Sequence, residues 1–281
     1  MTVKIVTDSS ADLPVQMAQE LGITVVPLYV RFGEEVYRER VDITDDQFYH
    51  RLINGPIHPV TSQPTPQDFA DAYQKLSAEA DGIVSIHISS KLSGTHNSAV
   101  QGKAMLEKAC PIEVVDSKSI TMTMGLVAIA AARMAATGAG LQQVLEFVNR
   151  EIPNINLLGL LDTLKYLQLG GRIGKAKALL GSILNVKPMV TIRDGEVHPV
   201  ANVRTRTKGI QRLIDFAKSA QGIEDLAIAQ ATTPEDAQAL AEQMAEAYTK
   251  GPVKVVRLGT TLGVHAGPGT LLVAFRGKAA A

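Results

Sequence analysis

Short apolar segments that favour strands alternate along the chain with longer segments that favour helices. Val3 to Thr7, Gly82 to Ile88 and Ile112 to Val115 are strand segments of this kind in the first half. Strands that are separated by helices form βαβ units, and such units build mainly parallel sheets. The alternation therefore predicts an α/β fold whose first half is a mainly parallel sheet with flanking helices.

The second half of the chain has a different pattern. Met189 to Ile192 and Glu196 to Val203 flank the dipeptide Asp194-Gly195, which favours the tight turn of a β-hairpin. Further strands, at Leu226 to Ala229 and Leu271 to Phe275, alternate with helical segments. An antiparallel hairpin beside βαβ units predicts a second α/β region with a mixed sheet.

Pro153 and Asn154 follow an amphipathic stretch and mark a candidate boundary. A chain of 281 residues has an ordinary length for two domains. We therefore expect an N-terminal α/β domain over residues 1–153 and a C-terminal α/β domain over residues 154–281. Helices are expected over residues 44–53, 67–80, 93–109, 123–136, 208–219 and 234–248, and Asp12 is expected to be the N-cap of an earlier helix.

The balance of positive and negative residues limits the kinds of partner that the protein is expected to bind. Lys and Arg together number 28, as do Asp and Glu, so the formal net charge is zero. A protein without a global basic field is not expected to bind nucleic acid or to adhere to anionic membranes. The longest apolar stretch, Met122 to Ala136, is too short to span a bilayer and predicts a buried helix. The single cysteine and the absence of a signal-peptide pattern predict a cytoplasmic location.

Two loops rich in hydroxyl groups are candidate binding loops. In the first, Thr61 and Ser62 precede Pro64 and Pro66, which fix an extended backbone, although an N-cap at Thr65 explains the same pattern. The second loop follows a strand and contains Ser93 and Gly94 at the start of a helix, where free backbone N–H groups attract anions. Ser93 as an N-cap is compatible with such a binding role.

Two glycine-rich segments carry a single cationic or titratable side chain each. Arg172 follows Gly170-Gly171 and suits a carboxylate or phosphate, but it is equally typical of a solvated arginine in a turn. His265 lies among four glycines, and a structural histidine explains this pattern as well as a functional one does. The chain contains neither a phosphate-binding loop nor the spacing of a metal site. We therefore expect no cofactor, no metal and no catalytic residue.

Five motifs in order resemble the DegV family, which includes fatty-acid-binding subunits of bacterial fatty acid kinase. The motifs are Thr7-Asp-Ser-Ser-Ala-Asp-Leu13, Thr61-Ser-Gln-Pro64, Leu92-Ser-Gly-Thr95 with Asn97, Gly170-Gly-Arg-Ile173 and Gly263-Val-His-Ala-Gly-Pro-Gly269. His96 departs from the family pattern, in which an aromatic residue is usual at that position. The resemblance extends from residue 7 to residue 269 and so covers essentially the whole chain.

The resemblance implies a protein that is not itself an enzyme and that binds a long-chain fatty acid such as palmitate in a tunnel. It implies that Thr61, Ser62 and Ser93, with the Gly94 backbone nearby, surround the carboxylate, and that Arg172 and His265 complete a polar mouth. In members that work with a kinase, a separate ATP-using subunit phosphorylates the bound carboxylate. The basic side chains that would dock such a subunit are Arg204 and Arg206.

The binding energetics assign different roles to the carboxylate and to the acyl tail of the fatty acid. A sixteen-carbon tail gains roughly 11 kcal/mol gross at about 0.8 kcal/mol per methylene, so the tail supplies most of the affinity. Each hydrogen bond to the carboxylate adds about 1.5–3 kcal/mol and fixes the orientation. Met122 to Ala136 and Ala178 to Leu184 are candidate tunnel linings. Two alternatives are a serine hydrolase acting through Ser93 and His265, and a regulatory module without catalysis.

Overall fold

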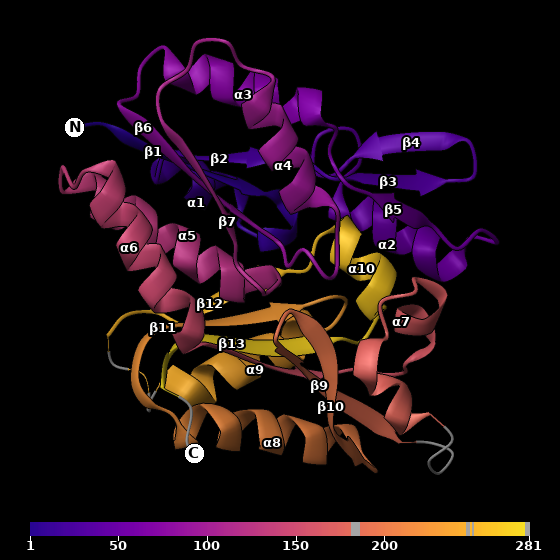
Figure 1. Ribbon diagram of the computed structural model, residues 1–281. Helices are drawn as coiled ribbons and strands as arrows, with labels where there is room; N and C mark the ends of the chain where they lie inside the picture. Colours follow the sequence, from indigo (N-terminus) through magenta and orange to yellow (C-terminus); the bar gives the residue numbers. More distant parts are fainter. Residues whose placement is uncertain (181–185, 246–247, 249, 279–281) are drawn as a thin grey trace.

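A parallel sheet forms the upper half of the protein in the computed structural model, which describes residues 1–180, 186–245, 248 and 250–278 (Figure 1). Its strand order is β2-β1-β6-β7, and every neighbouring pair is parallel, as predicted for the first half of the chain. The strands are β1 (Val3–Asp8), β2 (Ile23–Val26), β6 (Gly82–His87) and β7 (Ile112–Asp116). Two helices, α3 (Pro66–Ser77) and α4 (Thr95–Ala104), cover the outer face of this sheet.

A mixed sheet of six strands forms the lower half. Its order is β10-β9-β8-β13-β11-β12, in which only β11 and β12 are parallel. The strands are β8 (Ile155–Leu160), β9 (Lys187–Arg193), β10 (Glu196–Val203), β11 (Gln221–Gln230), β12 (Lys254–Arg257) and β13 (Leu271–Lys278). The outer face is covered by α8 (Arg206–Ser219) and α9 (Pro234–Ala245) (Figure 1). The predicted α/β fold with a mixed second sheet is confirmed.

The turn between β9 and β10 confirms the predicted hairpin. Asp194 and Gly195 both have positive φ angles, 51° and 79°. Two consecutive residues with positive φ form the turn whose twist matches that of paired antiparallel strands. The Asp-Gly dipeptide therefore determines where this hairpin turns.

Helix α5 (Thr121–Ala136) lies between the two sheets (Figure 1). Thirteen of its residues are buried, so the predicted buried helix is confirmed. Apolar residues all round a helix are typical of an element that is covered on both sides. One core cluster accordingly joins side chains of the first sheet, of α5 and of the second sheet. Helix α6 (Leu141–Glu151) and the 3-10 turn η2 (Ile152–Asn154) then lead into β8.

A small antiparallel sheet of order β4-β3-β5 projects from the upper half. Its elements are β3 (Tyr29–Phe32), β4 (Glu35–Arg38) and β5 (Val60–Ser62), and α2 (Asp45–Asn54) lies beside it. The late helix α10 (Thr260–Ala266) packs against this unit, and Leu262 and Val264 share a core cluster with Phe48. A helix from the C-terminal part of the chain thus packs on elements of the N-terminal part. The division into two domains between residues 153 and 154 stays a prediction.

Asp12 is not the N-cap of a helix, contrary to the sequence prediction. Asp8 accepts the capping bond from the Ser10 N–H, and the 3-10 turn η1 (Ser9–Ala11) ends at Asp12, whose φ is 54°. Helix α1 (Val15–Glu20) begins only after Pro14. The Asp12 carboxylate instead accepts from the Gly259 N–H at 2.7 Å and from the Thr121 hydroxyl at 2.6 Å. A local pattern could not show these long-range partners.

Other predicted bounds shift by a few residues. The helix expected over residues 93–109 covers Thr95–Ala104, and Ser93 lies just before it. Of the candidate lining segment Ala178 to Leu184, residues 181–184 lie outside the described residues, and 178–179 belong to the 3-10 helix η3 (Gly174–Leu179). The end of the helix expected over residues 234–248 falls partly on 246 and 247, which also lie outside.

Candidate functional site

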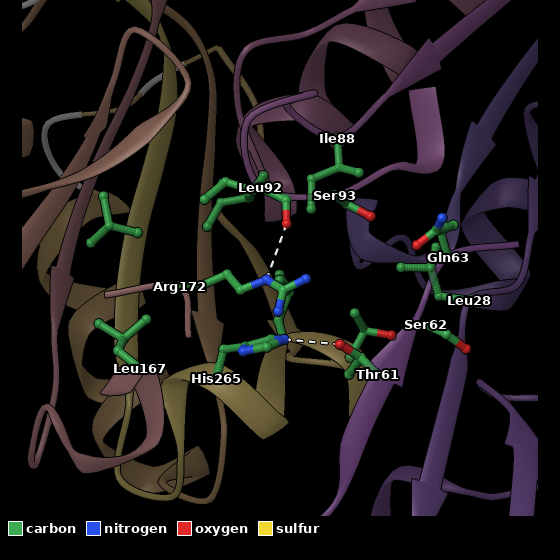
Figure 2. Close-up of a pocket in the computed structure, with 14 residues that line it drawn as sticks. Leu28, Thr61, Ser62, Gln63, Ile88, Leu92, Ser93, Leu167, Arg172 and His265 are labelled. Carbon is green, nitrogen blue, oxygen red and sulfur yellow. Dashed lines mark hydrogen bonds between the residues drawn. The ribbon is translucent and has the colours of Figure 1, made fainter. Parts of the chain in front are cut away.

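One cavity brings together residues from four of the loops and elements that carry motifs. Thr61, Ser62, Ser93, Arg172 and His265 all line it, although they are up to 204 residues apart in the chain. The other lining residues are Leu28, Gln63, Ile88, Leu92, Ile120, Leu167, Val197, Thr261 and Leu262. Figure 2 shows the polar side chains meeting in the space between the upper and lower halves. The cavity has about 60 Å³ of free space.

Thr61 and Ser62 lie on β5, a short strand at the edge of the small sheet. Thr61 pairs with Val30 and Ser62 with Tyr29. The following segment leaves the sheet at Pro64, and Thr65 caps α3 by accepting a hydrogen bond from the Asp68 N–H. The proposed N-cap at Thr65 is thus confirmed, and it holds the loop that presents Thr61 to the cavity.

Ser93 lies in the loop that joins β6 to α4, at the carboxyl edge of the parallel sheet. Its Oγ is 2.8 Å from the Oγ1 of Thr95 and accepts the Thr95 N–H at 3.3 Å. The adjoining Gly94 lines an outer polar groove with Ser93 rather than the cavity itself. A Cβ at Gly94 would lie 2.7 Å from the Nε2 of Gln63, so glycine allows the two hydroxyl-rich loops to touch.

Arg172 follows α7 (Lys165–Leu169) and reaches across to the Ser93 loop. Its Nε donates to the Leu92 carbonyl at 3.2 Å (Figure 2). Its Nη1 donates to the Gly170 carbonyl at 2.9 Å. The residue as a whole is exposed, so its charge meets both the cavity and solvent. Such a fork is suited to a carboxylate or phosphate at the mouth.

His265 lies near the end of α10 with its ring largely buried. The Nε2 atom is 3.0 Å from the Oγ1 of Thr61. Burial, followed by the positive charge of Arg172 and by His58, lowers the His265 pKa to about 4. The ring is therefore neutral at pH 7. Its Nδ1 is buried and has no hydrogen-bond partner within the described part of the chain.

This arrangement does not support the serine hydrolase alternative. A hydrolase needs the nucleophile bonded to the base and an acidic group that orients the base. Here His265 contacts Thr61, whereas Ser93 contacts Thr95. The Nδ1 atom, which an acid would have to orient, meets no carboxylate among the residues described.

Arg204 and Arg206 differ in their surroundings. Arg204 is exposed just after β10. Arg206 is half-buried and donates to Asp236 at 2.6 Å, to Asp162 at 3.3 Å and to the Gly269 carbonyl at 2.7 Å. The Arg206 guanidinium is thus hydrogen-bonded within the protein. Arg204, which is exposed, is therefore the better candidate for docking a partner.

Gln63, Thr261 and the apolar residues Leu28 and Ile120 were not predicted as site residues. Gln63 belongs to the Thr61–Pro64 motif, and Thr261 lies two residues before the Gly263–Gly269 motif, so their closeness to these motifs was the available signal. Leu28 and Ile120 carry no such signal, because a lining leucine or isoleucine has the same pattern as a core residue.

Two further findings concern metals and membranes. Across residues 1–180, 186–245, 248 and 250–278, no group of three or more His, Cys, Asp or Glu side chains is placed to hold a metal ion. Within those same ranges, no helix has the length and apolar character needed to cross a membrane.

Comparison with known proteins identifies the family. A model described as that of an uncharacterised protein of the DegV family matches residues 2–278. This chain belongs to the DegV family. A DegV domain-containing protein of Streptomyces coelicolor is 38% identical over 274 residues, which cover 96% of each chain. The DegV protein of Bacillus subtilis is 30% identical over 275 residues, or 96% of this chain and 98% of its own. The resemblance inferred from the five motifs is confirmed.

Several solved structures share the whole architecture of this chain. A DegV family protein from Thermus thermophilus, described by its fatty acid binding, has a TM-score of 0.91 at 32% identity and covers 98% of this chain and 100% of its own. Bacillus subtilis DegV, described as a fatty acid binding protein, has a TM-score of 0.89 at 29% identity, with coverage of 99% and 100%. A stearic acid-binding protein from Eubacterium ventriosum has a TM-score of 0.87 at 27% identity and covers 98% of each chain.

Proposed function

We propose that this DegV protein binds one long-chain fatty acid, with the carboxylate among Thr61, Ser62 and Ser93 and the tail in the apolar part of the cavity. Three solved relatives are described as binding fatty acids, one of them stearic acid. The cavity combines hydroxyl groups and the Arg172 guanidinium with apolar side chains such as Leu28, Ile88 and Ile120. An amphipathic ligand with one anionic end fits this combination.

The contact between Thr61 and His265 carries the proposal. A neutral imidazole has one N–H, and its Nδ1 meets no partner among the described residues. A buried N–H without an acceptor is rare, so the proton belongs on Nε2, from which it is donated to the Thr61 Oγ1. The Thr61 hydroxyl is then left with its own proton free for a carboxylate oxygen. The pair therefore acts as a donor toward the ligand.

The tail requires more space than the cavity now offers. The free space of about 60 Å³ holds little more than the head of a long acyl chain. Each buried methylene gains about 0.8 kcal/mol, so several methylenes together outweigh the roughly 0.5–1.5 kcal/mol that one strained side-chain rotamer costs. We therefore expect side chains at the inner end of the cavity to move when the tail enters.

Presentation to a separate kinase subunit is the second part of the proposal. Arg172 lies at the mouth, where the carboxylate of a bound fatty acid would meet a phosphoryl donor from outside. Among the docking candidates, the exposed Arg204 can reach a partner, whereas Arg206 is bonded to Asp162 and Asp236. Arg204→Glu should therefore lower acyl phosphate formation by a purified fatty acid kinase without lowering fatty acid affinity. Equal turnover with both forms would remove the docking role.

Solvent extraction of the purified protein followed by mass spectrometry tests fatty acid binding. We expect about one fatty acid per chain, such as palmitate, and a reduced amount from Ser93→Ala. Ser90→Ala is the matched control, because Ser90 lies in the same loop but bonds to Asp116 outside the cavity. A protein that carries no fatty acid and takes up none when it is added would overturn the proposal.

A further inference from the structure

The motif from Thr7 to Leu13 differs from the other four motifs, because none of its side chains lines the cavity. Its five polar residues are nevertheless at most 4% exposed, and they are Thr7, Asp8, Ser9, Ser10 and Asp12. Buried polar side chains are tolerated where they find hydrogen-bond partners. The partners of these side chains therefore indicate what the motif does.

Two side chains of the motif hold backbone segments that form walls of the cavity. The Asp8 Oδ2 accepts the Ile88 N–H at 3.0 Å. The Ser9 Oγ accepts the Leu28 N–H at 2.9 Å. Ile88 and Leu28 both line the cavity (Figure 2), and they lie 80 and 19 residues from these partners in the chain. The motif thus fixes walls that come from separate parts of the sequence.

Glu39 connects the motif to α10. Its side chain is buried, and its Oε2 accepts from the Ser9 Oγ at 2.6 Å and from the Thr261 Oγ1 at 2.7 Å. Its Oε1 accepts the Thr261 N–H at 3.1 Å. The first N–H groups of a helix have no partner within the helix, so Glu39 satisfies one of the free donors of α10. Thr261 itself lines the cavity.

Asp12 holds the start of the same helix and one more wall. Its Oδ1 accepts the Gly259 N–H at 2.7 Å, and its Oδ2 accepts the Thr121 hydroxyl at 2.6 Å. Thr121 has a φ of 50°, which is rare for a β-branched residue and persists only where the surroundings hold it. The neighbouring Ile120 lines the cavity. The bond to Asp12 therefore helps to hold that wall in place.

We propose that Ser9, Asp12 and Glu39 are positioning residues for the fatty acid site. They do not line the cavity themselves, and they set the places of its walls and of α10. The inference rests on the proposed fatty acid binding. His265 lies on α10 and meets Thr61 at 3.0 Å, so a shift of α10 breaks this contact. Loss of a positioning side chain therefore lowers fatty acid affinity through groups that the side chain does not touch.

A matched pair of variants within the motif separates positioning from stability. Ser9→Ala and Thr7→Val each remove one buried hydroxyl. The Thr7 Oγ1 donates to the carbonyl of Ile86, which does not line the cavity. Both variants should be less stable than the wild type in urea denaturation, because each loses a buried hydrogen bond. Only Ser9→Ala should weaken palmitate binding to delipidated protein, by at least fivefold. Equal palmitate affinities of the two variants would overturn the inference.

Substitutions of Glu39 provide a second test. Glu39→Met removes both acceptor oxygens at a similar side-chain length, and Glu39→Gln keeps one of them. Palmitate affinity should fall at least tenfold in Glu39→Met, and Glu39→Gln should restore most of it. In the wild type, Thr61→Val should weaken binding more than tenfold. In Glu39→Met the same change should weaken binding less than threefold, because Thr61 has already lost His265. A Thr61→Val effect of equal size in both backgrounds would refute the positioning role.

Histidine NMR of lipid-free protein observes the His265 ring without any ligand. The His265 signal should change in Glu39→Met and stay unchanged in Thr7→Val. An unchanged signal in Glu39→Met would contradict the displacement of α10. Should Glu39→Met fail to fold, the comparison of Ser9→Ala with Thr7→Val still decides the inference. A wild-type protein that binds no fatty acid would refute the proposed function, whereas the NMR comparison would still decide whether Glu39 sets the place of α10.

Discussion

Thr61 and His265 meet across 204 residues of sequence, with 3.0 Å between the Thr61 Oγ1 and the His265 Nε2. One residue lies on an edge strand of the small sheet, and the other lies on the last helix before β13. The contact therefore closes the site only when the C-terminal helix packs on the N-terminal elements. In the proposed function it also turns the Thr61 hydroxyl toward the ligand.

Replacement of Thr61 by valine keeps the shape of the side chain and removes its hydroxyl. We expect Thr61→Val to weaken fatty acid binding by about 1.5–3 kcal/mol, the value of a hydrogen bond to a charged group, which corresponds to more than a tenfold change. Calorimetric titration of delipidated protein measures it. Thr61→Ser keeps the hydroxyl and should bind within a few fold of the wild type. Equal affinity of the valine and serine variants would remove Thr61 from the head-group site.

Gly170 leaves the space that the His265 ring occupies. A Cβ at this position would lie 2.0 Å from the His265 Nδ1, so Gly170→Ala must displace the ring and with it the contact to Thr61. We expect at least a tenfold loss of fatty acid affinity, measured by displacement of a fluorescent fatty acid. Gly171→Ala is the control, because Gly171 has a φ of 69° and nothing within 4 Å of an added Cβ. That variant should lose about 1 kcal/mol of stability and keep its affinity.

The sequence located the polar mouth better than it located the tail site. Hydroxyl groups and glycines at strand ends are locally unusual, so Thr61, Ser93, Arg172 and His265 could be singled out before their convergence was visible. The alternation of strands and helices likewise predicted both sheets. The burial of Glu39 could not be predicted, because its hydrogen-bond partners Ser9 and Thr261 lie 30 and 222 residues away in the chain.

We predict that ionisation of the Asp12 carboxyl lowers the stability of the folded protein as pH rises. Burial raises the pKa of this carboxyl from 3.8 to about 7, and Glu39 adds to the rise while Arg40, 4.0 Å away, opposes it. A folded-state pKa above that of the unfolded chain means that the folded protein binds more protons between pH 3.8 and about 7. The contribution is therefore fully present below pH 3.8 and is lost as pH rises through about 7.

Asp12→Asn tests this direction, because asparagine keeps an oxygen that can accept the Gly259 N–H. The free energies of unfolding of both proteins are measured by urea denaturation at pH 5 and pH 8. The free energy of unfolding of Asp12→Asn should increase relative to that of the wild type as pH rises. A difference between the two proteins that stays constant with pH would contradict a raised Asp12 pKa.

For His265 we predict the opposite pH dependence of stability, because the pKa of its ring is lowered rather than raised. Its pKa falls from 6.5 to about 4, chiefly because the ring is buried, so between these values the unfolded chain binds a proton that the folded protein does not. Its contribution to stability is therefore fully present above pH 6.5 and is lost as pH falls through about 4. With 2.5 pH units between 6.5 and 4 at about 1.4 kcal/mol per unit, the loss is about 3.5 kcal/mol. His265→Gln cannot titrate and should lack this part of the acid destabilisation in lipid-free protein, whereas His50→Gln, at an exposed position, should retain it. Histidine NMR titration gives the pKa itself, and a value near 6.5 for His265 would contradict the pKa lowered by burial on which this pH dependence rests.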